Sequence, residues 1–173
     1  MGFVEEREMA EAALEASDLE GTEKPYPPVA RRIREAREAL GLSYEELADR
    51  WGQPTSMTWD PERFDHEAFD VLSVEELSKL AAVLQTPLLS LLFGEEPVPP
   101  LRPTGFDEIA EGLRARMRTD AISVEDLAER VGWELQSFLD DPSTLGQLPI
   151  FGLRWVCREV GADWVSVLES LQS

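Results

Sequence analysis

The chain contains the stretch Leu42-Ser43-Tyr44-Glu45-Glu46-Leu47-Ala48-Asp49-Arg50-Trp51-Gly52, and a second copy follows eighty residues later as Ile122-Ser123-Val124-Glu125-Asp126-Leu127-Ala128-Glu129-Arg130-Val131-Gly132. Each copy begins with a Ser whose hydroxyl can cap a helix, and an acidic residue three positions later can bond back to the capping residue's N–H. A Leu-Ala pair one turn further on would face a core, and the final Gly can adopt the positive φ that ends a helix. The repeat therefore indicates two homologous helical units.

Length and composition suit two small units that share a core. The chain has 173 residues, of which 43% are hydrophobic, an ordinary fraction for a globular protein. No uninterrupted apolar run is long enough to span a membrane, and the first twenty residues are acidic, unlike a signal peptide. We therefore expect a cytoplasmic protein.

The charge is strongly negative, with 16 basic residues against 35 acidic ones and a formal net charge of −19. DNA-binding proteins draw much of their affinity from Lys and Arg side chains that displace counterions at phosphates. A surface this negative repels nucleic acid before any base is read, so the charge disfavours DNA binding.

Composition shifts divide the chain into four segments. Residues 1–24 should form an acidic, amphipathic N-terminal helix or arm, whose apolar face packs either on its own chain or on a partner. Residues 25–94 form the first unit and residues 104–173 the second. Between them, residues 95–103 contain four prolines, which predict an extended linker.

Two stretches of the first unit resemble a known family. Ile33-Arg34-Glu35-Ala36-Arg37-Glu38-Ala39-Leu40-Gly41-Leu42-Ser43-Tyr44-Glu45-Glu46-Leu47-Ala48 resembles the start of the helix-turn-helix domain of the Cro and lambda-repressor (XRE) class, and Leu84-Gln85-Thr86-Pro87-Leu88-Leu89-Ser90-Leu91-Leu92-Phe93-Gly94 resembles its end. The second unit matches more weakly at the same positions. The resemblance implies an all-α protein of two tandem five-helix bundles plus the N-terminal helix, with helices two and three of each bundle forming a DNA-reading motif.

The motif departs from the family where DNA would be contacted. The family commonly has Gln after the helix-two Ser, at a position occupied here by Tyr44 and Val124. The segments that correspond to the reading helix, 53–60 and 133–140, contain no Lys or Arg. The scaffold signal is thus stronger than the DNA-reading signal.

We therefore expect a protein that acts mainly through protein–protein contacts or self-association, with an acidic surface that in one variant mimics DNA. The candidate partner-binding residues lie in an acidic segment with aromatic anchors: Trp59, Asp60, Glu62, Phe64, Asp65, Glu67 and Asp70.

The alternative hypothesis is a sequence-specific transcriptional regulator that uses the first unit. It places Arg31, Arg32, Arg34 and Arg37 at phosphates, and Gln53, Thr55, Ser56 and Thr58 at base edges. The same arginines are also explained by a solvated helix face on which they pair with neighbouring carboxylates. A third hypothesis is a sensor with a small-ligand pocket between the units.

Enzymatic residues are not apparent. His66 is the only histidine and Cys157 the only cysteine, and we expect a solvated loop residue and a buried core residue, respectively. The sequence contains neither a glycine-rich phosphate loop nor metal-ligand spacing. We expect no enzymatic activity, cofactor or metal.

Overall fold

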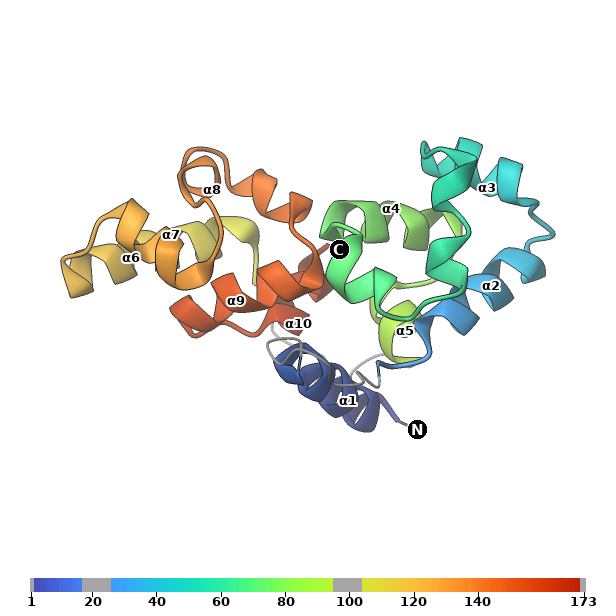
Figure 1. Cartoon of the computed structure of the whole chain (residues 1–173), viewed down its shortest axis with the longest axis horizontal. Coiled ribbons are helices and arrows are strands. Elements are labelled where there is room, and N and C mark those ends of the chain that lie inside the picture. The colour runs from blue at the N-terminus through green and yellow to red at the C-terminus, as the bar shows by residue number, and fades with distance from the viewer. Residues whose placement is uncertain (1, 17–25, 95–103, 172–173) are drawn as a thin grey trace.

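The computed structural model describes residues 2–16, 26–94 and 104–171, and this part of the chain is helical without a β-strand, which confirms the all-α class (Figure 1). The helices in chain order are α1 (Phe3–Ala16), α2 (Val29–Ala39), α3 (Tyr44–Trp51), α4 (Val74–Val83), α5 (Leu88–Phe93), α6 (Phe106–Asp120), α7 (Val124–Val131), α8 (Gln136–Asp140), α9 (Ile150–Val160) and α10 (Trp164–Ser170). The predicted linker 95–103 lies outside the described residues. Among those that are described, no helix combines the length and hydrophobicity needed to span a membrane.

The capping boxes of the repeated stretch form as predicted. The Ser43 hydroxyl accepts the Glu46 N–H at 3.1 Å, and the Glu46 carboxylate accepts the Ser43 N–H at 2.8 Å. Ser123 and Asp126 make the same two bonds at the start of α7. The helices end at glycines with φ of 75° and 79°, a conformation that L side chains rarely adopt. The local sequence thus sets both ends of α3 and α7.

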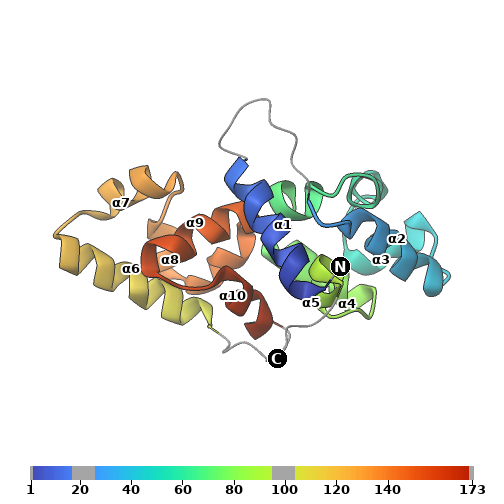
Figure 2. The same ribbon diagram turned by 90° about the horizontal axis from the view of Figure 1, so that it is seen from below.

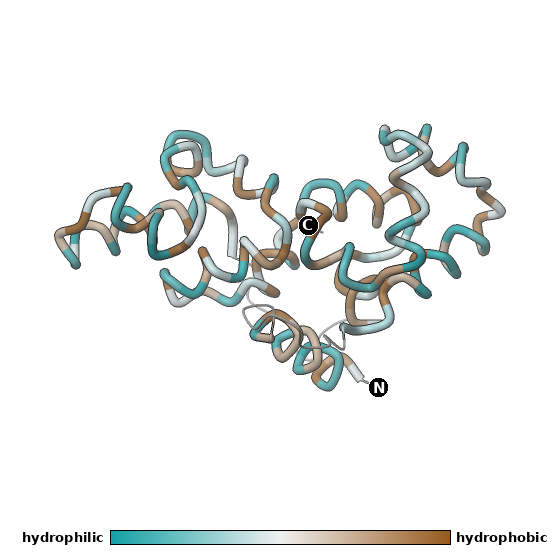
Figure 3. The backbone as a smooth tube through the Cα atoms, viewed as in Figure 1, coloured by the Kyte–Doolittle hydropathy of each residue, from teal (hydrophilic) through white to brown (hydrophobic). Residues whose placement is uncertain are grey.

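Hydrophobic residues recur along every helix (Figure 3), and their buried members form one core that continues through both halves of the molecule. The contacts between the halves are reciprocal. Helix α4 packs on the 3-10 turn Pro142–Gln147, and α9 packs on the π-helical turn Glu67–Val71, while α5 packs on α10. These are corresponding elements at a sequence spacing of 76, so each half presents the same face to the other.

The elements at the junction of the halves are related by an approximate two-fold axis. At the spacing of 76, Ser73 corresponds to Pro149, and these two residues pair with each other as an isolated antiparallel bridge. Beside them, the Val74 N–H donates to the Leu148 carbonyl at 2.7 Å. A residue that contacts its own counterpart lies near a two-fold axis, and reciprocal contacts around it are those of an isologous dimer. At the junction, the elements of the two halves therefore pack against each other as in a two-fold dimer.

Helix α1 lies over the junction of the two halves (Figure 2). Ala10, Ala13 and Leu14 are fully buried, and the Phe3 ring lies 5.0 Å from that of Phe93 in α5. Its carboxylates bind arginines of both halves, since Glu6 pairs with Arg32 and Glu11 with Arg154. The apolar face of α1 is thus covered by its own chain.

The third helix of the first unit was predicted wrongly. Described residues 53–71 form 3-10 turns at Thr55–Met57 and Asp60–Glu62 and the π-helical turn, and no α-helix. Pro54 and Pro61 cannot donate backbone hydrogen bonds, which favours short turns over a continuous helix. The first unit therefore has four α-helices instead of five, whereas α6 to α10 supply five in the second.

Candidate protein-interaction site

Large hydrophobic side chains gather at the surface of one segment. Among the described residues, those exposed by more than a third are Val4, Met57, Trp59, Phe64 and Val71, and four of these five lie within residues 57–71. Trp59 is 52% exposed and Phe64 44%. We call residues 57–71 the acidic aromatic segment. It contains all seven predicted partner-binding residues, and six of them, all except Glu62, are at least partly exposed to solvent. Exposed aromatic residues are enriched at protein interfaces.

Side-chain hydrogen bonds attach this segment to the rest of the first half. The Asp65 carboxylate accepts the Ala30 N–H in the first turn of α2 at 2.8 Å. The Asp70 carboxylate accepts the Tyr26 hydroxyl at 2.8 Å, and the Tyr26 ring stacks on Phe69 at 5.0 Å. These contacts hold the backbone in place, and Trp59 and Phe64 remain about half exposed. The Trp59 ring lies 5.8 Å from the Tyr44 ring, and the Phe64 ring lies 5.7 Å from that of His66.

Two further acidic residues differ in their surroundings. Asp60 is exposed, whereas Glu67 is partly buried and lies 3.5 Å from the His66 imidazole. Burial raises the pKa of Glu67, although the nearby His66 opposes this shift. His66 itself is about half exposed, as expected for a solvated loop residue.

Glu62 is not a surface residue, contrary to its place among the candidates. Its side chain is 1% exposed and forms a bidentate pair with Arg37, with Nε to Oε1 at 2.6 Å and Nη2 to Oε2 at 3.1 Å. The Tyr44 hydroxyl donates to the same carboxylate at 3.2 Å, and the Arg37 guanidinium lies 4.4 Å from the centre of the Tyr44 ring. The Glu62 hydrogen bonds raise the pKa of Arg37. Tyr44 thus helps to bury this ion pair.

The four arginines proposed for phosphate contacts are not equally free. Arg32 binds Glu6 and donates to the Leu92 carbonyl at 2.8 Å, and Arg37 is held by Glu62. Arg34 donates to the Glu62 carbonyl at 2.5 Å, and exposed Arg31 lies 3.7 Å from Glu35. The expectation of a solvated face on which arginines pair with carboxylates holds for Arg31. Arg32 and Arg37 also pair with carboxylates, but their side chains are largely buried and not solvated.

The proposed base-contacting residues are also partly engaged. Thr58 is 1% exposed and donates its hydroxyl to the Thr55 carbonyl at 2.7 Å, so it is inaccessible to a base edge. The Gln53 amide donates to Glu76 at 3.2 Å. Ser56 is exposed and Thr55 is half-buried. The structure therefore does not present all eight residues of the DNA hypothesis on one free surface.

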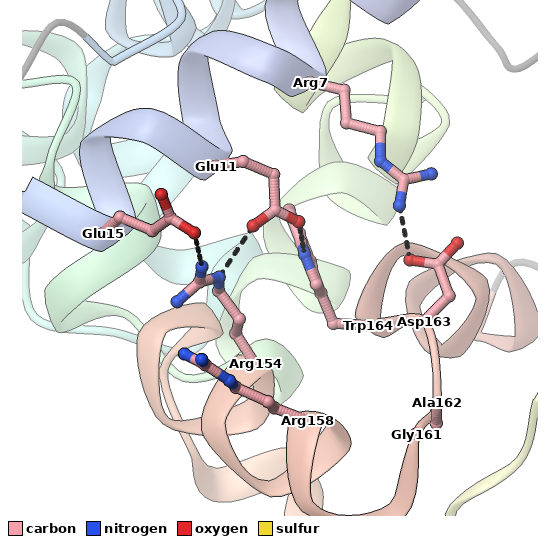
Figure 4. A pocket seen from close by; sticks show the side chains of 9 residues that line it. All are labelled: Arg7, Glu11, Glu15, Arg154, Arg158, Gly161, Ala162, Asp163 and Trp164. Atoms are coloured by element: carbon pink, nitrogen blue, oxygen red, sulfur yellow. Dashed lines mark hydrogen bonds and ion pairs between the residues drawn. The ribbon is translucent and has the colours of Figure 1, made fainter.

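A pocket of about 590 Å³ lies where α1 meets α9 and the start of α10 (Figure 4). Three arginines and three carboxylates line it: Arg7, Arg154, Arg158, Glu11, Glu15 and Asp163. Most of these groups pair with each other, with Arg7 to Asp163 at 2.7 Å and Arg154 to Glu11 and Glu15 at 2.7 and 3.1 Å. The charges balance, and the pairs fasten α1. Sequence reasoning missed this cluster because its members are separated by more than 130 residues.

Cys157 is buried, as predicted, and burial raises the pKa of its thiol to about 12. Within the described ranges, no group of three or more His, Cys, Asp or Glu side chains is placed to hold a metal ion.

No family model, curated protein or solved structure matches this chain. The resemblance to repressor-like domains accordingly remains a prediction from the residues quoted above.

Proposed function

We propose that the protein is a non-enzymatic regulator, built on a tandem repressor-like helix-turn-helix scaffold, that binds a basic protein partner through the acidic aromatic segment. The observation that carries this proposal is the concentration of exposed large hydrophobic side chains in residues 57–71. Elsewhere in the described chain, only Val4 is comparable.

The composition of the segment specifies the kind of partner. Trp59 and Phe64 can enter apolar pockets, because aromatic side chains supply large contact areas and often dominate binding energy. The neighbouring Asp60 and Glu67 carboxylates, together with a net charge of −19, favour Lys and Arg around those pockets. A partner that normally binds nucleic acid has this combination of positive charge and exposed binding groups, which makes DNA mimicry a special case of the proposal.

Several features support the scaffold. The α2–α3 pair, Val29–Trp51, contains the stretch Ile33–Ala48 that carries the family resemblance, and α4 and α5 follow in the expected order. The reciprocal contacts at the junction of the halves are compatible with a protein that has approximate two-fold symmetry, as dimeric helix-turn-helix proteins do. DNA reading is less well supported, because residues 53–71 lack a regular helix and Arg32 and Arg37 donate to groups of the protein itself.

The test is affinity capture from the native host with three immobilised proteins. They are the wild type, the double variant Trp59→Ser/Phe64→Ser, and the control Val4→Ser, which removes an exposed apolar side chain elsewhere. We expect a basic protein to be retained by the wild type and by the control, and to be lost with the double variant and at high salt. Equal capture by all three proteins would contradict the proposal.

A selection from random DNA duplexes at about 50 mM salt tests the DNA alternative. Enrichment of a specific sequence motif would refute a purely protein-directed function.

A further inference from the structure

The second half contains a cavity with aromatic walls. It measures about 310 Å³, at the lower end of the range for ligand sites, and it lies where the end of α7 meets α9. Its lining residues are Glu129, Arg130, Val131, Gly132, Trp133, Phe151 and Trp155. The Phe151 and Trp155 rings are 6.4 Å apart at 80° to each other, so they form two adjacent walls. A cavity of this size suits a small group.

The third wall depends on a glycine. A Cβ atom at Gly152 would lie 2.8 Å from the Trp133 indole, so any larger residue would displace the ring. In the first half, Gln53 and Glu76 occupy the corresponding positions at spacings of 80 and 76, and they share a hydrogen bond of 3.2 Å. At these positions the second half thus has an aromatic cavity wall, on a glycine, where the first half has a polar pair.

The charges at the cavity favour a cation. Aromatic faces carry partial negative charge, and the exposed Glu129 adds a full one. The Arg130 guanidinium faces two other carboxylates, Asp120 at 3.5 Å and Glu159 at 3.6 Å, which offset its charge. The Arg158 guanidinium, which is not part of the cavity lining, lies 5.3 Å from the Trp155 ring centre. This ring therefore accepts a cation, while the charge of Arg158 opposes a second one and makes the Glu129 carboxylate the decisive group.

We propose that this cavity binds a small alkylated ammonium group, which the aromatic walls hold by cation–π attraction and Glu129 by charge. Alkylammonium groups suit such a site because they are cationic and weakly hydrated, and aromatic cages are known to recognise them. This inference is independent of the acidic aromatic segment, which belongs to the other half of the molecule.

The experiment compares choline with its uncharged carbon isostere, 3,3-dimethylbutan-1-ol, by calorimetric titration of the full chain. Both probes have nearly the same shape, so a difference in affinity reports the charge. We expect choline to bind and the isostere to bind at least tenfold more weakly. Equal affinity of the two, or no heat from choline above the dilution control, would overturn the proposal.

Variants of α7 locate the site. Glu129→Gln should weaken choline binding several-fold, whereas Glu125→Gln, which removes the same charge from the same helix outside the cavity, should leave the affinity unchanged. Both residues are exposed, so neither change should prevent folding. Equal losses from the two variants would show a general charge effect and refute the assignment. Trp155→Phe, which keeps an aromatic wall, should retain part of the affinity.

Discussion

The Arg37→Met substitution tests whether the buried ion pair beneath the acidic aromatic segment stabilises the fold. Glu62 is 1% exposed and Arg37 is 11% exposed, so removal of the guanidinium leaves a carboxylate away from water. The loss of one partner of such a pair costs about 3–5 kcal/mol, because the remaining charge is uncompensated. Arg37 also donates to the Leu42 carbonyl at 2.8 Å, and that acceptor would be left empty as well. We expect destabilisation within this range.

The measurement is urea unfolding followed by far-UV circular dichroism. Arg31→Met is the matched control, because Arg31 is 66% exposed and makes a single contact of 3.7 Å with Glu35. A surface pair of this kind contributes about 0–1 kcal/mol. The double variant Arg37→Met/Glu62→Leu should recover much of the loss, since it removes both charges. If Arg37→Met and its control differ by less than about 1 kcal/mol, the pair is solvated and our description of the segment is wrong.

Three smaller predictions follow from local geometry. Ser43→Ala should cost about 1 kcal/mol in urea unfolding at neutral pH, because a capping hydroxyl is lost. The Ser43 hydrogen bonds lower the pKa of Glu46, so the stability that they contribute is complete above the ordinary carboxyl pKa. It is lost as the pH falls through the lowered pKa. An effect of Ser43→Ala that grew on acidification would contradict this. Gly152→Ala should destabilise by about 1–3 kcal/mol and shift the indole fluorescence, because its methyl group would overlap Trp133. Cys157 should resist a thiol reagent at pH 8 until the protein unfolds, because burial raises its pKa to about 12, and rapid labelling of the native protein would refute that placement.

Local signals in the sequence predict local structure well here. Ser43 and Ser123 cap helices because the hydroxyl, the acid three residues later and the helix start are encoded within four positions. The family resemblance implies a third helix in the first unit, but the chain forms short 3-10 turns at Thr55–Met57 and Asp60–Glu62 there instead. For this segment, the resemblance to a helix-turn-helix domain was therefore a poor guide to the local backbone conformation.

Distant partners explain the errors in the candidate site. Glu62 resembles a surface residue because its neighbours in sequence are polar. It can be buried only because the Arg37 guanidinium from α2 compensates its negative charge. Conversely, Trp133 looks like a core residue, and only its contact with Gly152 in α9 leaves it as the wall of a cavity. No sequence pattern predicts either contact, because the two residues of each pair lie on different elements and far apart in the chain.

The orientation of α1 follows from the differences between the two halves. A surface with approximate two-fold symmetry offers one helix two opposite orientations, and apolar contacts alone would distinguish them weakly. Glu6 binds Arg32 and Glu11 binds Arg154, whereas the positions equivalent to these arginines are Gly112 and Ser78. Because neither sequence counterpart is positively charged, these two ion pairs favour the observed direction of α1. A single chain permits such divergence, because each half can change without changing the other, and a homodimer does not.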